Sequence, residues 1–95
     1  MPTTYTFTIT QRPKGRRDHD RHPVRQELAR QRALSLGLTH IVIGAWTTGQ
    51  PRTRTWTVTD PTDAAPGTNN PVYRLVDIFN YFEFVEVTAG PTAAP

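Results

Sequence analysis

The N-terminal segment alternates between polar and apolar side chains in the pattern of a β-strand. Over residues 4–10, threonine occupies every even position, and Tyr5, Phe7 and Ile9 occupy the positions between them. Successive side chains of a strand point to opposite faces of a sheet, so the apolar side chains share one face and the threonines share the other. The pattern therefore predicts a strand that buries one face.

A second segment repeats this alternation in the middle of the chain. Over residues 52–59, threonine occupies every odd position, and Trp56 and Val58 lie on the opposite face. Arg52 and Arg54 precede them on that face. Two such strands would present eight threonines on one side: Thr4, Thr6, Thr8, Thr10, Thr53, Thr55, Thr57 and Thr59. We expect these threonines to form either a solvated sheet surface or a flat face that pairs with another protein or a second protomer.

Two shorter runs complete the predicted sheet. Residues 40–43 end in three β-branched apolar residues, and the turn-forming residues 47–51 separate them from the second alternating strand, which predicts a hairpin. Residues 83–88 alternate again and predict the last strand. The residues that follow, 89–95, are rich in proline and alanine and predict a flexible tail.

Two helices are predicted between these strands. Asn70 followed by Pro71 is the order of an N-cap and a first helical residue. Residues 24–36 predict a weakly amphipathic helix that begins after Pro23 and ends at Gly37. In the later helix, the apolar residues recur at helical spacing along one stripe: Val72, Leu75, Val76, Phe79 and Phe82.

The order strand, helix, strand, strand, helix, strand predicts one small α+β domain over residues 1–88. The simplest way to bury two helices on one face of an antiparallel sheet with right-handed crossovers is the ferredoxin-like sandwich. The expected core consists of Tyr5, Phe7, Ile9, Val72, Leu75, Val76 and Phe79. RNA-recognition motifs share this element order but stack bases on exposed aromatic side chains of the central strands. Threonine occupies that face here, which disfavours RNA binding on the sheet.

The basic residues are concentrated in one segment of the chain. Eight of the eleven lie in residues 12–32, which have a formal charge of +5 against −2 for the remainder. They are Arg12, Lys14, Arg16, Arg17, Arg21, Arg25, Arg30 and Arg32. Because residues 11–22 contain almost no apolar side chain, we expect them to form a mobile basic loop. The segment is either an ordinary solvated surface or a binding site for an acidic partner.

The sequence lacks the residue sets that enzymes and metal sites require. It has no cysteine, a single serine, and no glycine-rich phosphate-binding loop, so we expect no catalytic activity. Two histidines and two aspartates lie within residues 18–22, but arginines surround them and no second pair of ligands follows, so we expect no metal or other cofactor. No apolar run approaches the roughly 20 residues of a membrane span, and we expect a cytoplasmic protein.

These patterns predict a small non-enzymatic protein-binding module of the kind that phages and mobile elements encode, which binds and modulates a host macromolecule. The abundance of arginine, threonine, proline and alanine is typical of GC-rich genomes such as those of actinobacteria and their phages. Trp46, near the hairpin turn, is the aromatic candidate for the interface, although a tryptophan there would also close the edge of a core. The alternative function is nucleic-acid binding through residues 12–32. A homodimer is compatible with either function.

Overall fold

The computed structural model describes residues 2–11, 16–49, 51–62, 64–65, 67, 69–81 and 85–94, with only the backbone described for residues 16–25 and 81. Its elements are β1 (Thr3–Gln11), α1 (Arg16–Ser35), β2 (Thr39–Ile43), β3 (Thr53–Asp60), α2 (Pro71–Tyr81) and β4 (Val85–Ala93). This order confirms the predicted α+β arrangement. No helix within the described ranges is both long enough and apolar enough to cross a membrane.

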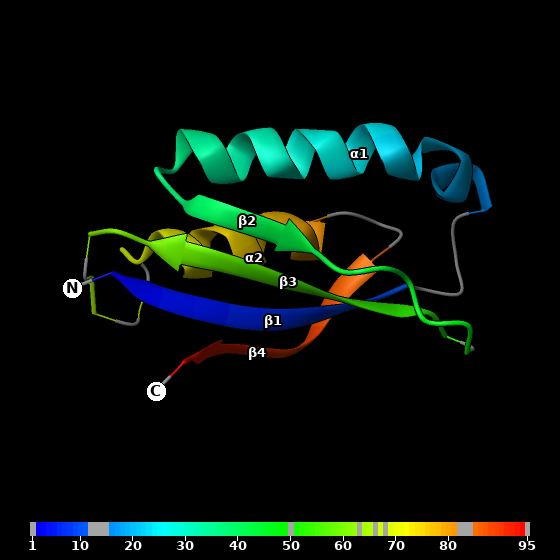
Figure 1. Ribbon diagram of the computed structural model, residues 1–95. Helices are drawn as coiled ribbons and strands as arrows, with labels where there is room; N and C mark the ends of the chain where they lie inside the picture. The colour runs from blue at the N-terminus through cyan, green and yellow to red at the C-terminus, as the bar shows by residue number, and fades with distance from the viewer. Residues whose placement is uncertain are drawn as a thin grey trace.

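The four strands form one antiparallel sheet in the order β2-β3-β1-β4. This is the strand order of the ferredoxin-like sandwich that the sequence predicts. In Figure 1, α2 lies behind the sheet and α1 runs along its β2 margin. The two helices pack against each other, and within the described residues neither helix lies over the opposite face of the sheet.

The core lies between the central strands and α2. The predicted core residues Tyr5, Phe7, Ile9, Val72, Leu75 and Phe79 are buried, and Val76 is partly buried against them. Trp56 is also fully buried, with its ring centroid 6.1 Å from that of Phe7 and 4.9 Å from that of Phe79 in an edge-on arrangement. These three rings join β1, β3 and α2 in one cluster. Phe82 lies outside the described residues.

The first helix begins earlier than the sequence predicts. It starts at Arg16 and not after Pro23, so residues 16–22 are helical and not part of a loop. A shortage of apolar residues argues against a contact with the core, but it does not by itself exclude a helix. Arginine has a high helix propensity, and Asp18 and Asp20 fall near the helix N-terminus, where the helix dipole favours negative charge.

Small side chains hold α1 against β2 and α2. Ala29 and Ala33 are completely buried, whereas Leu28 and Leu34 are 56% and 45% exposed. Alanine lets the helix backbone approach its neighbours closely, so α1 is attached by its least bulky side. Its leucines consequently face solvent.

The last strand continues to Ala93, whereas the composition of residues 89–95 predicts a tail. It pairs with β1 as far as Tyr5, and two register shifts place extra β4 residues opposite β1. Gly90 lies in one of these bulges with a φ of 83°. A Cβ at this position would lie 2.6 Å from the carbonyl oxygen of Thr6, so the close approach of the two strands requires glycine.

The N-cap predicted for the second helix is confirmed. The Oδ1 atom of Asn70 accepts a hydrogen bond from the backbone N–H of Val72 at 2.8 Å. Its Nδ2 atom donates to the hydroxyl of Tyr5 and to the carbonyl of Ala64, each at 3.2 Å. Asn70 is completely buried, so one side chain both starts α2 and ties it to β1.

We predict that Gly90→Ala lowers the free energy of unfolding by about 3 kcal/mol, because the added methyl group combines a strained φ with a backbone clash. Urea denaturation monitored by tryptophan fluorescence measures the change. Gly49→Ala is the control, since no atom lies within 4 Å of a Cβ built there, and it should change stability by less than about 0.5 kcal/mol. Equal effects of the two substitutions would contradict the role of Gly90.

We predict that Asn70→Ala destabilises the protein by about 2 to 3 kcal/mol, because it removes a helix cap and leaves buried hydrogen-bonding groups without a partner. Thermal unfolding followed by circular dichroism measures this loss. The neighbouring Asn69 is exposed, so Asn69→Ala should leave the melting temperature nearly unchanged. A similar melting temperature for both variants would show that the cap contributes little.

Candidate functional site

The predicted basic residues are gathered mainly on one helix. Six of the eight lie in α1, namely Arg16, Arg17, Arg21, Arg25, Arg30 and Arg32. The backbone alone is described for the first four, and Arg30 and Arg32 are exposed. Arg12 and Lys14 lie outside the described residues. The basic segment is therefore largely a helix, which fixes the spacing of its cations along one axis.

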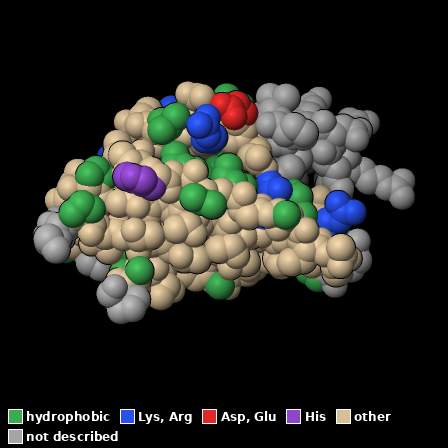
Figure 2. Space-filling view, viewed as in Figure 1, with side chains coloured by type: hydrophobic (Ala, Val, Ile, Leu, Met, Phe, Trp, Pro, Cys, Tyr) green, Lys and Arg blue, Asp and Glu red, His purple; other side chains and the backbone are tan. Residues whose placement is uncertain are grey.

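The exposed end of α1 combines charged and apolar side chains. Arg30 lies 3.4 Å from Glu27 as an ion pair, and Gln31 donates a hydrogen bond of 2.8 Å to the same carboxylate. Figure 2 shows apolar, basic and acidic side chains close together over this helix. The exposed Leu28 and Leu34 lie on the same part of α1, and we call these five residues with Arg32 the α1 surface. Leucines exposed to this degree distinguish the surface from a purely ionic one.

Arg54 forms a contact that sequence reasoning did not single out as a site. Its guanidinium carbon lies 4.6 Å from the centroid of the Trp46 ring, and its Nη1 atom donates a hydrogen bond to Oε1 of Gln26 in α1. Partial burial lowers the pKa of Arg54 from its ordinary value, because desolvation disfavours the charged form. The ring and the amide oxygen offset part of this penalty. The alternation of β3 already indicates that Arg54 faces the core side.

Trp46 is half-buried and packs against the core. Its position fits the edge-closing role that the sequence offers as one alternative. The Arg54 guanidinium contacts both Trp46 and α1, so the structure brings this predicted aromatic residue towards the basic helix. Its participation in an interface stays a prediction.

The uncovered side of the sheet carries the predicted threonines. They face each other across β1 and β3 in four register pairs: Thr4 with Thr59, Thr6 with Thr57, Thr8 with Thr55, and Thr10 with Thr53. From β4, Thr92 lies opposite Thr6, and the hydroxyl of Thr88 lies 2.7 Å from that of Thr10. We call these ten residues the threonine face. In Figure 2 it is turned towards the viewer and is mostly tan, with basic side chains at its margins.

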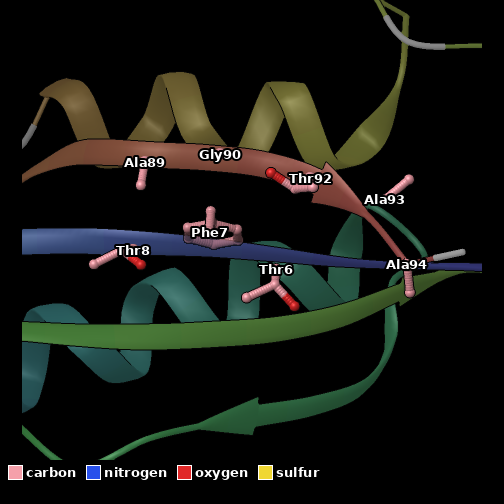
Figure 3. Close-up of a pocket in the computed structure, with 8 residues that line it drawn as sticks. All are labelled: Thr6, Phe7, Thr8, Ala89, Gly90, Thr92, Ala93 and Ala94. Carbon is pink, nitrogen blue, oxygen red and sulfur yellow. The ribbon is translucent and has the colours of Figure 1, made fainter.

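A pocket of about 370 Å³ lies on the threonine face between β1 and β4. Figure 3 views it from the uncovered side, with both helices behind the strands. It is lined by Thr6, Phe7, Thr8, Ala89, Gly90, Thr92, Ala93 and Ala94. The bulges of β4 open this hollow, because they move its backbone out of regular pairing with β1. Methyl groups make up much of the lining.

Base stacking on the sheet is disfavoured by the burial of the aromatic residues. Phe7 and Trp56, on the central strands, are turned towards the helices and are inaccessible. No group of three or more potential metal-ligating side chains occurs among those described. The side chains of residues 18–22 are not among them, so the expectation of no metal there stays a prediction.

Comparisons with known proteins add no family to this description. No protein-family model, no curated protein and no solved structure matches the chain.

We predict a coupling free energy of about 1 kcal/mol between Arg54 and Trp46 in a double-mutant cycle of Arg54→Met and Trp46→Leu. Methionine keeps the aliphatic stem and removes the cation, so the cycle isolates the cation–π contact. Urea denaturation of the four proteins measures it. A matched cycle with Arg52→Met, at an exposed position two residues away, should give a coupling near zero. Equal coupling in both cycles would assign the effect to packing.

Proposed function

We propose that the protein is a non-enzymatic module that binds an acidic surface of a partner protein through the α1 surface. The observation that carries this proposal is the exposure of Leu28 and Leu34, 56% and 45%, beside the exposed cations Arg30 and Arg32. An apolar side chain gains free energy when a partner removes it from water, and an arginine beside it supplies directional hydrogen bonds. A purely solvated helix face needs no leucine.

The charge of α1 favours an acidic partner. Six arginines stand against Asp18, Asp20 and Glu27 in this helix, within a chain whose formal net charge is +3. Such an excess accelerates encounters with negatively charged surfaces and disfavours basic ones.

Nucleic-acid binding is the second candidate, and the helical start of α1 favours it. Arg17, Arg21 and Arg25 recur every four residues within the helix, and positions four apart lie on the same helix face. A row of arginines on one face suits a phosphate backbone, which attracts cations regardless of sequence. Protein binding and nucleic-acid binding differ in the role of the leucines, because apolar side chains do not bind phosphate groups.

We predict that Leu28→Ser/Leu34→Ser reduces capture of the partner protein about tenfold or more, as expected for the loss of buried anchor residues. Immobilised protein is incubated with a nuclease-treated lysate of the source organism, and bound proteins are quantified by mass spectrometry. Arg74→Ala, an exposed change on α2, is the matched control and should capture the same protein as the wild type.

The alternative is tested with the same variants and labelled duplex DNA, single-stranded DNA and RNA. Fluorescence anisotropy is measured at about 50 and about 200 mM salt, because phosphate contacts weaken steeply over this range. Salt-sensitive binding that survives the leucine substitutions, together with leucine-independent protein capture, would overturn the protein-binding proposal. Absence of nucleic-acid binding at the lower salt concentration would remove the alternative.

A further inference from the structure

The threonine face is a second surface, on the opposite side of the sheet from the helices. The sheet edges are poorly suited to association. Pro91 and two register shifts interrupt β4, and a register shift between Thr39 and Val42 interrupts β2. Bulges and proline are the devices by which edge strands avoid pairing with another chain. Any association through this sheet must therefore use its uncovered face.

One row of residues crosses the whole threonine face. Val42 pairs with Thr57, Thr57 with Thr6, and Thr6 with Thr92. Val42 shares the face of Thr57 and is 61% exposed, so it is a projecting apolar side chain at the β2 end of the row. The alanine-lined pocket lies at the other end, around Thr6 and Thr92 (Figure 3). A projection and a hollow thus lie at opposite ends of one row.

We infer that the threonine face binds a second copy of this chain, with Val42 of each protomer seated in the β1–β4 pocket of its partner. A twofold axis that runs parallel to the strands, between the two faces and over the middle of the row, exchanges the two ends of the row. That operation places β2 of one protomer over β4 of the other, and it forms the same contact twice, as an isologous interface requires. Two sheets that pack face to face keep their strands within about 30° of each other, which preserves this alignment.

The centre of the threonine face is uncharged. Two chains of formal charge +3 repel each other, and the repulsion is weaker where the contact itself carries no cation. All four register pairs between β1 and β3 are threonine pairs, whereas Glu86, opposite Thr10, and the basic side chains in Figure 2 lie at the margins. Face-to-face contact also keeps the two α1 helices on opposite outer sides of the dimer.

The threonine side chains suit a buried interface better than their polarity suggests. The hydroxyls of Thr4 and Thr59 lie 3.1 Å apart, and those of Thr10 and Thr88 lie 2.7 Å apart, so these four hydroxyls have partners within the chain. Thr10 and Thr59 are already buried in the single chain, and the hydroxyls of the more exposed Thr4 and Thr88 lose less on leaving water because they are hydrogen-bonded. The methyl groups of the same side chains supply apolar contact.

Sedimentation equilibrium over a range of protein concentrations tests the proposal. The wild type should have twice the mass of one chain, and Val42→Asp should be a monomer, because the dimer would bury two unpaired carboxylates. Its dissociation constant should rise by more than about a hundredfold. Ala65→Asp, at an exposed position outside the strands, is the control and should remain a dimer. A wild-type monomer throughout, or a dimer that Val42→Asp leaves intact, would overturn the inference.

Engineered cysteines test the geometry directly, because the chain has none of its own. The double variant Val42→Cys/Thr92→Cys should be linked into a covalent dimer by a short bismaleimide reagent, because the twofold axis places Val42 of one protomer over Thr92 of the other and packed sheets lie about 10 Å apart. Within one chain the two positions lie about 14 Å apart across three strand spacings, which is too far for such a reagent to bridge. Val42→Cys alone and Ala65→Cys/Thr92→Cys should stay unlinked. Equal linkage in all three variants would contradict the twofold arrangement.

This inference goes beyond the proposed function, since it concerns a different surface. Val42→Asp should retain capture of the partner protein by α1, and Leu28→Ser/Leu34→Ser should retain the doubled mass. The failure of one proposal is therefore separable from the failure of the other.

Discussion

The packing of Phe7, Trp56 and Phe79 is the contact on which the other features of the molecule depend. Phe7 and Trp56 lie opposite each other in β1 and β3, so their burial sets the register of the two central strands. A shift by one residue would turn the threonines of one strand into the core. Phe79 contacts both rings and thereby positions α2 over these strands. Once this register is set, the threonines of both strands point to the uncovered face of the sheet.

The sequence predicts those parts of the fold that depend on local periodicity. The alternation of β1 and β3, the stripe of α2 and the cap at Asn70 are each visible within about ten residues, and together they imply the ferredoxin-like order. The residue at which α1 starts and the length of β4 cannot be predicted from such local patterns. The first turns of α1 carry no apolar periodicity that would reveal a helix, and the need for glycine at position 90 depends on the carbonyl of Thr6, which is remote in sequence.

The candidate surfaces show the same division between local and tertiary information. The threonine face follows from alternation alone, and the concentration of arginine follows from composition. The exposure of Leu28 cannot be predicted in this way, because tertiary packing determines that α1 buries the side that carries Ala29 and Ala33. The pocket also requires the β4 bulges. The result is a molecule with an arginine-rich helix on one side of its core and a threonine-rich sheet face on the other.

The position of β1 has a consequence for how the protein is made. This strand is synthesised first, yet it lies between β3 and β4, and its outer side pairs with the last strand of the sheet. A nascent chain therefore carries a strand of aromatic and β-branched residues with an open edge until β4 has left the ribosome exit tunnel. Such long-range pairing slows folding and leaves the unfinished chain prone to aggregation. The sheet can therefore be completed only after its last strand has been synthesised.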